Sequence, residues 1–200
     1  ALELDGNLGG NIGNTSHSSG DLDISGNSTA VNIVNGAQIY AGNVSAGVSP
    51  TDVDTIYVSD PSSRLVASGT LSVGVDGNAT LTVVNGGNVT SGTGYVGENA
   101  GAHGTATVNG TISQWNLGSN GLFVGANGTG TLTISNGGDV TSGAGTVASA
   151  SGSNGTVTVD GVSSRWNAGS GDLVVGDSGS GTLTVSNGGN VTIGSGVLGS

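Results

Sequence analysis

Two short groups of acidic residues are the first candidates for chemistry in this chain: Asp21/Asp23 near His17, and Asp52/Asp54 near Asp60. On an extended strand, the two acids of a pair would lie on one face about 7 Å apart, which suits the carboxylates of an inverting glycoside hydrolase. Asp52, Asp54 and Asp60 could also hold a calcium ion. The sequence guarantees no Lys or Arg nearby to stabilise developing charge. We therefore interpret these acids as solvated loop residues and predict no catalytic, cofactor or metal site.

Paired threonines form a second candidate surface. They recur as Thr-x-Thr at five places: Thr80/Thr82, Thr105/Thr107, Thr131/Thr133, Thr156/Thr158 and Thr182/Thr184. Stacked strands would turn them into a two-column grid of hydroxyl and methyl groups, which resembles the ice-binding faces of some β-solenoids. Thr is also a good polar strand residue that stacks well on itself. The grid is a possible ligand surface, with Thr131 and Thr133 at its centre.

Trp115 and Trp166 could present flat surfaces to sugars, but their fixed place in the repeat favours a packing role over this ligand-binding one. Arg165 could anchor an acidic ligand, although pairing with Asp160 or Asp172 is the simpler expectation. The segment 42–54, which contains Asp52 and Asp54, does not follow the sequence repeat of the rest of the chain. It is our first candidate for a specific binding loop, because departures from a repeat tend to map to one face.

The composition excludes several classes of protein. The net charge is −11, with 13 carboxylates against only two basic residues, so the basic footprint needed for nucleic acid or anionic lipid is missing. There is no cysteine for disulfides or thiolate metal sites. No apolar run is long enough to span a membrane, so this segment is not expected to insert into one. With 42 glycines and 3% aromatic residues, any core must be thin and built from small branched side chains.

A repeat of 51 residues organises the chain. The segments "ATLTVVNGGNVTSG", "GTLTISNGGDVTSG" and "GTLTVSNGGNVTIG" place Leu81, Leu132 and Leu183 at constant spacing. The shorter, similar segments "GTATVNG" and "GTVTVDG" lie about midway between them, so the underlying spacing is about half as long. Each word opens a strand in which apolar and polar residues alternate, which is typical of a half-buried strand and argues against disorder. Three short strands in about 25 residues, joined by Gly-rich corners, predict one coil of a parallel β-solenoid.

We therefore predict an all-β protein, a right-handed parallel β-helix of seven to eight coils with about 25 residues per coil. Residues 1–200 would form a single β-helix fragment. Within it, 55–200 are regular coils in 51-residue double-coil repeats, and 1–54 are less regular coils. One coil of each pair carries "SNGG" at a corner and the next carries Trp, so that Trp and Val would alternate along the stack.

The words "TVTVDG", "SSRWN", "LVVGDSGSGTLTVSNGG" and "NVTIGSG" closely resemble passenger repeats of type V autotransporters of Gram-negative bacteria. The resemblance is strong over residues 55–200 and loose before them. It implies a β-helix exported through the outer membrane and displayed extracellularly on the bacterial cell surface. The family's export signal and membrane barrel are not in this sequence, so we expect an excised piece of a longer protein.

From this resemblance we expect a non-enzymatic role: adhesion to a host cell-surface or matrix component, self-association, or a stalk that holds an adhesive tip. Two alternatives remain open. One is a carbohydrate-active β-helix enzyme that depends on Asp21 or Asp52. The other is an ice-binding β-solenoid that uses the outward threonines.

Overall fold

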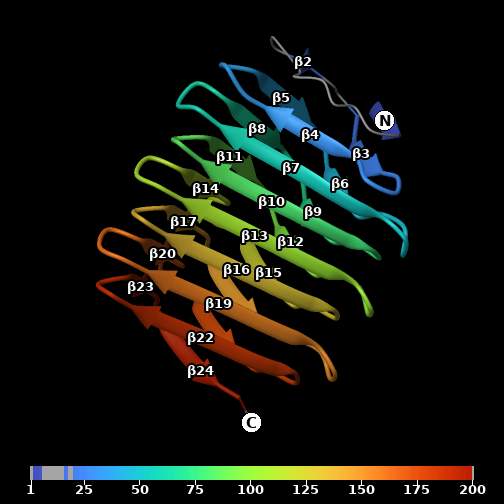
Figure 1. Ribbon diagram of the computed structural model, residues 1–200. Coiled ribbons are helices and arrows are strands. Elements are labelled where there is room, and N and C mark those ends of the chain that lie inside the picture. The colour runs from blue at the N-terminus through green and yellow to red at the C-terminus, as the bar shows by residue number, and fades with distance from the viewer. Residues whose placement is uncertain (1, 6–15, 18–19, 200) are drawn as a thin grey trace.

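The computed structural model describes residues 2–5, 16–17 and 20–199. The described chain is a right-handed parallel β-solenoid of about seven turns, with one short strand from each of three sheets in every coil (Figure 1). All strand pairs are parallel, and each strand bonds to its counterparts one coil before and one coil after. The predicted fold class is therefore confirmed. No helix among the described residues is long and apolar enough to cross a membrane.

The three sheets run the length of the rod. The long-strand sheet contains β4 (Ala30–Ile33), β7 (Val53–Ser59), β10 (Asn78–Val84), β13 (His103–Asn109), β16 (Thr129–Ser135), β19 (Asn154–Asp160) and β22 (Ser180–Ser186). The tryptophan sheet contains β2 (Ser16–His17), β5 (Gln38–Ala41), β8 (Arg64–Ala67), β11 (Asn88–Ser91), β14 (Gln114–Asn116), β17 (Asp139–Thr141), β20 (Arg165–Asn167) and β23 (Asn190–Thr192). The third sheet contains β1 (Leu2–Asp5), β3 (Leu22–Ser25), β6 (Val44–Ala46), β9 (Leu71–Val73), β12 (Gly94–Val96), β15 (Gly121–Val124), β18 (Ala144–Val147), β21 (Asp172–Val175) and β24 (Ser195–Leu198).

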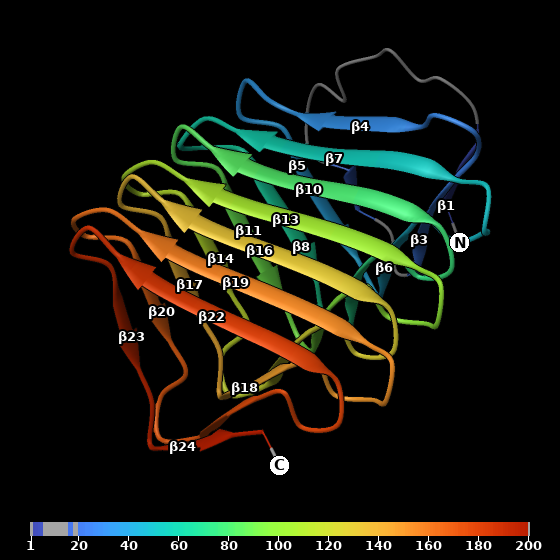
Figure 2. The same cartoon turned by 60° about the horizontal axis from the view of Figure 1, so that its bottom comes forward.

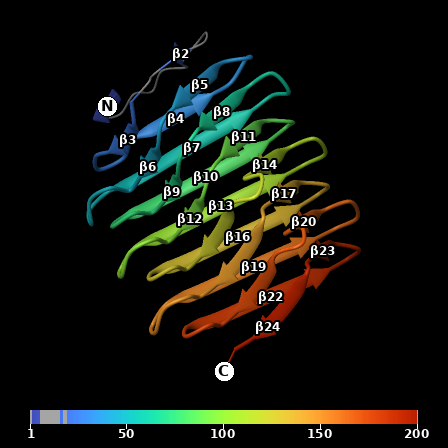
Figure 3. The same ribbon diagram turned by 180° about the vertical axis from the view of Figure 1, so that it is seen from behind.

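The sheets enclose a narrow core (Figure 2), and β3 and β24 lie at opposite ends of the rod (Figure 3). Alternation along each strand sends one side chain inward and the next outward. In β16, for example, Leu132 and Ile134 are fully buried while Thr131 and Thr133 face outward. The inward assignment made from the sequence is thus confirmed for the central coils. The alternation in "ALEL" at residues 1–4 predicts the same inward direction for Leu2 and Leu4, whose side chains lie outside the described residues.

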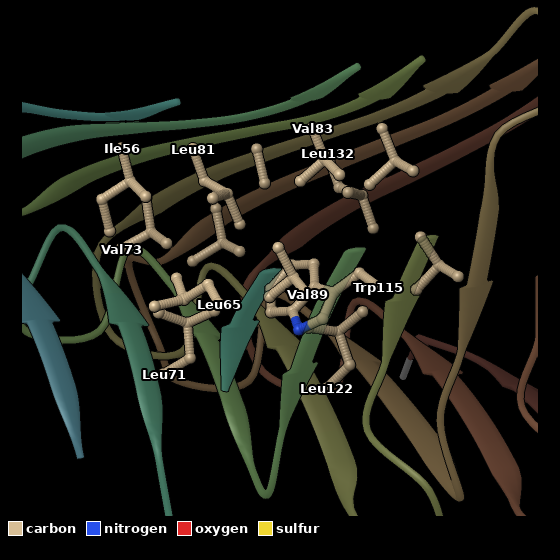
Figure 4. Packing of buried hydrophobic residues seen from close by; sticks show 14 of the residues in the cluster. Ile56, Leu65, Leu71, Val73, Leu81, Val83, Val89, Trp115, Leu122 and Leu132 are labelled. Carbon is tan, nitrogen blue, oxygen red and sulfur yellow. The ribbon is translucent and has the colours of Figure 1, made fainter. Parts of the chain in front are cut away.

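Trp and Val alternate in one inward column of the tryptophan sheet. Val89 pairs with Trp115, Trp115 with Val140, and Val140 with Trp166. Both indoles are fully buried, and Figure 4 shows Trp115 beside Val89 and Leu122. The predicted interdigitation of large and small residues is confirmed.

Each indole depends on two residues of the preceding coil. Trp115 Nε1 donates to Ser91 Oγ at 3.0 Å, and Trp166 Nε1 donates to Ser142 Oγ at 3.0 Å. A Cβ added to Gly94 would lie 2.9 Å from the Trp115 ring, and one on Gly145 would lie 2.5 Å from the Trp166 ring. The absence of a side chain at these glycines therefore makes room for the tryptophans.

The corners between the long-strand and tryptophan sheets also alternate. One coil turns through Asn-Gly-Gly, where Asn85, Asn136 and Asn187 adopt left-handed φ values of 52°, 53° and 50°. The next coil turns through a segment that ends in a buried serine, and this serine hydroxyl accepts from a glycine amide of the preceding corner. The three such bonds are Gly36 to Ser63, Gly86 to Ser113 and Gly137 to Ser164, at 3.1, 2.9 and 2.9 Å.

Candidate functional site

Asp52 and Asp54 are buried, so the interpretation of this pair as solvated loop acids is wrong. Asp54 Oδ1 accepts from the Thr29 amide at 3.0 Å, and its Oδ2 accepts from the Gly47 amide at 3.0 Å. Asp52 Oδ2 accepts from the Ser49 amide at 2.9 Å. These carboxylates therefore hold turns of the backbone together.

The position of Asp54 in its column explains this role. In the following coils the same position is held by Ala79 and then by Gly104. A Cβ on Gly104 would lie 2.1 Å from the Val73 carbonyl oxygen and 2.3 Å from the Gly97 nitrogen, because the chain passes close to the strand where β9 and β12 end. Around Asp54 the carboxylate instead joins the Thr29 and Gly47 amides of two successive turns.

The acidic groups do not converge as the calcium and hydrolase hypotheses require. Asp60 follows the far end of β7, six residues and about 20 Å from Asp54 along an extended strand. It accepts from the Asn35 amide, while Asp21 accepts from the amide and side chain of Asn43. The side chain of His17 lies outside the described residues. Within the described ranges, no three His, Cys, Asp or Glu side chains are grouped to hold a metal ion.

The segment 42–54 contains β6 and a turn that the later coils repeat. The turn at 47–52 has the same backbone pattern as those at 97–102 and 148–153. Each is closed by one amide-to-carbonyl bond: Asp52 to Ser49, Ala102 to Asn99 and Ser153 to Ala150. The segment is therefore a standard corner of the solenoid rather than an inserted binding loop.

Burial raises the pKa of Asp54 above its ordinary value of 3.8, and the charge of Asp52 adds to this, while the amides of Thr29 and Gly47 act in the opposite direction. The folded state therefore holds the Asp54 proton at a pH where the unfolded chain has released it. The stabilisation from protonation is complete below pH 3.8 and is lost as pH rises through the folded pKa. We expect the advantage of wild type over Asp54→Asn in free energy of unfolding to grow as pH falls from neutral to 3.8, measured by urea unfolding.

Asp160 offers a matched control with the opposite sign. Hydrogen bonds from Ser186 and Asn187 lower the pKa of its exposed carboxyl. Its contribution is present above pH 3.8 and is lost as pH falls through the lowered folded pKa. The difference between wild type and Asp160→Asn should therefore shrink on acidification. If the difference in free energy of unfolding between wild type and Asp54→Asn also shrank on acidification, burial would not be the dominant effect on the pKa of Asp54.

The tryptophans cannot serve as a sugar platform, because both are completely buried and their ring nitrogens are satisfied inside the core. The outward aromatic pair is Tyr95 and Phe123 on the third sheet, with ring centroids 5.1 Å apart and planes at 13°. Their faces cover each other, so this pair stabilises adjacent coils of the ladder.

The paired threonines do form two continuous outward columns. Thr80, Thr105, Thr131, Thr156 and Thr182 pair successively in the first column, and Thr82, Thr107, Thr133, Thr158 and Thr184 in the second. The columns continue toward the N-terminus as Thr55 and Ala30 beside Tyr57 and Asn32. The regular grid therefore covers five coils of the long-strand sheet.

A polar row on the tryptophan sheet was missed by the sequence patterns. The first outward position of successive strands is always a planar amide, guanidinium or carboxylate: Gln38, Arg64, Asn88, Gln114, Asp139, Arg165 and Asn190. The only two basic residues of the chain both lie in this row. Arg165 Nη2 donates to Asp139 Oδ2 at 2.7 Å, so its predicted partners, Asp160 and Asp172, were wrong.

Beside this row lies an open groove with a volume of about 270 Å³. Its lining comes from three successive corners and the strands that follow them: Ile112, Gln114, Gly137, Asp139, Ser163 and Arg165. Ile112 and Ser163 adopt φ values of 63° and 69°. One carboxylate oxygen of Asp139, Oδ1, is buried and has no hydrogen-bond partner within the described part of the chain. The groove thus combines an apolar wall, an ion pair and an unsatisfied acceptor.

Comparisons with protein-family models, with curated proteins and with solved structures found no match to this chain.

Proposed function

We propose that this chain is a rod segment of an exported bacterial surface protein of the autotransporter-passenger type, with an adhesive rather than an enzymatic role. The observation that carries the proposal is the uninterrupted stacking of coils, which presents the same kinds of side chain at regular intervals along each face. Many weak contacts along such a face can add up to firm attachment to a host surface, a matrix component or another rod.

The acidic side chains support the non-enzymatic role. A glycoside hydrolase needs one carboxylic acid and one carboxylate facing a common substrate. Asp52 and Asp54 are instead buried among backbone amides. Asp21 is exposed and is engaged by Asn43. These contacts explain the acids by the stability of the turns alone.

The test is the attachment of beads coated with the folded chain to epithelial cells, to matrix proteins and to one another at physiological salt. Saturable attachment that soluble chain competes away would support an adhesive function within these coils. Beads that attach to nothing, although the protein melts cooperatively, would overturn the adhesive role and leave that of a stalk. The control is a bead coated with the chain after thermal unfolding.

A second candidate function, ice binding, is favoured by the threonine grid. Its two columns repeat about every 4.8 Å along the rod and are separated by about 7 Å along each strand. A rigid array of this kind can order water at its methyl and hydroxyl groups. This function would use the long-strand sheet and would leave the groove unoccupied.

For ice binding, we expect thermal hysteresis in the wild type that is lost in Thr133→Tyr, because a ring would stand above the plane of the grid. The fold should tolerate this change, since Tyr57 already occupies the same column. Thr146→Tyr is the matched control, because Thr146 lies on the third sheet next to Phe123. Equal hysteresis in wild type and Thr133→Tyr, or none in wild type, would exclude ice binding by the grid.

A further inference from the structure

We infer that the groove beside the polar row binds one ring of a neutral polysaccharide that lies along the rod. This inference rests on the proposed adhesive function and names the class of its partner. It is argued from the shape of the groove, the backbone of Ile112, the unsatisfied oxygen of Asp139 and the charge of the lining.

The lining of the groove combines one apolar side chain with several polar ones. Ile112 is 64% exposed and lies at the corner between β13 and β14. Gln114, Asp139 and Arg165 pair in register on three successive strands. Gly137 lines the groove without a side chain, and an added Cβ there would lie 2.9 Å from Thr111 Cγ2. A sugar ring presents the matching surfaces, with carbon-bound hydrogens on its face and hydroxyls around its edge.

The backbone at Ile112 is costly for folding. A β-branched residue with φ of 63° is a genuine outlier, because the left-handed conformation brings the Cβ of an L-residue too close to the following carbonyl oxygen. Gly would adopt this conformation without that cost. The Ile112 side chain lies over Gly86 of the preceding corner, yet 64% of the residue stays exposed. We assign this exposed apolar surface, kept at a strained corner, to contact with a partner.

The Asp139 carboxylate needs a hydrogen-bond donor. Its Oδ2 accepts from Arg165, while its Oδ1 is buried without a partner among the described residues. A buried acceptor without a donor is unfavourable, and a shift of the Asp139 side chain that exposes Oδ1 would let it accept from a ligand hydroxyl. Gln114 Oε1 already accepts from Asn88 Nδ2 at 3.2 Å, which leaves the Gln114 amide nitrogen to donate to a ligand oxygen.

The charges favour a neutral ligand. Arg165 and Asp139 compensate each other across 2.7 Å, so the groove carries no net charge. The whole chain carries −11, which repels polyanions. The polar row continues beyond the groove through Asn88 on one side and Asn190 on the other. A long neutral glycan can therefore contact further amides as it follows the rod axis.

The test is calorimetric titration of the 200-residue chain with neutral hexasaccharides built from glucose, mannose, galactose or N-acetylglucosamine, and with hexagalacturonate as an anionic probe. We expect one of the neutral probes to bind with an affinity that changes little between 50 mM and 500 mM NaCl. No binding of any neutral probe, or stronger and salt-sensitive binding of hexagalacturonate, would overturn the inference.

Two variants locate the binding. Ile112→Gly should weaken binding by about ten-fold or more while the melting temperature stays the same or rises, because the strain is relieved as the contact is lost. Asp139→Ala should also weaken binding by about ten-fold. Val162→Ala is the matched control, since Val162 is an exposed apolar residue of the next corner outside the groove lining. Equal loss in all three variants, or no loss in the first two, would contradict the assignment.

The bead experiment separates this inference from the proposed function. If beads carrying Ile112→Gly attach to cells as well as wild type does, the groove assignment fails and the adhesive function stands. If wild-type beads do not attach while a neutral hexasaccharide binds in the groove, the adhesive function fails and the groove assignment stands.

Discussion

Gly145→Val should destabilise the protein by about 3 kcal/mol or more, because the new side chain would collide with a buried indole. The Cβ alone would lie 2.5 Å from the Trp166 ring and 2.9 Å from Leu173 Cδ1. The ring cannot move away, since Trp166 is completely buried and bonded to Ser142. Urea unfolding followed by tryptophan fluorescence would measure the loss, with Thr146→Val as the control, because it places the same side chain at the adjacent outward position of β18.

An earlier coil of the same chain contains the compensating change. Two coils nearer the N-terminus, Val44 occupies the position of Gly94, and Leu65 occupies the position of Trp115. Trp166→Leu alone should cost about 2–4 kcal/mol by leaving a cavity. Combining it with Gly145→Val should recover much of both losses, with a coupling free energy of about 1–3 kcal/mol. Additive losses would show that glycine and tryptophan are not matched across coils.

Leu132→Asp should unfold the central coils, the second large effect we expect. Leu132 is fully buried between Ala106 and Val157 of the adjacent coils. The two arginines of the chain, Arg64 and Arg165, lie in the polar row of the tryptophan sheet, so an aspartate at position 132 would be an unpaired buried charge that costs several kcal/mol. Circular dichroism should show a reduced strand signal, and proteolysis should cut near the middle of the chain.

Thr133→Asp is the control for this prediction, because Thr133 is the adjacent residue and points outward. Its strand signal should match that of wild type. A soluble Leu132→Asp protein with an unchanged strand signal would refute the inward assignment of the whole column.

The regular coils were predictable because they depend on short-range rules. Alternation in "TLTIS" assigns Leu132 and Ile134 to the core without any knowledge of the neighbouring coils. The Asn-Gly-Gly corners follow from the ease with which Asn136 and Gly137 adopt positive φ. The pairing of Trp with Val needed only the constant spacing of the two coil types.

The functional residues were harder because their partners lie one coil away. The partner of Arg165 is Asp139, 26 residues earlier. The acids nearest in sequence bond to the following coil instead, Asp160 to Ser186 and Asn187, and Asp172 to Ser195. Alignment of successive coils would have found this pair, and would also have placed Asp54 in a column of small residues. No sequence signal identifies Ile112, because a β-branched residue predicts negative φ.

The alternation of coil types has a consequence for how genes for such rods can change in length. Each Trp coil requires a serine and a glycine in the coil before it, as Trp115 requires Ser91 and Gly94. Loss of the Val140 coil alone would place Trp166 against Leu117 and Leu122 in place of a serine and a glycine. Loss of the Trp115 coil alone would instead leave Ser91 and Gly94 without their indole. Gains and losses of 51 codons keep every serine, glycine and indole matched, so rods of this kind should vary in steps of two coils, or about 10 Å.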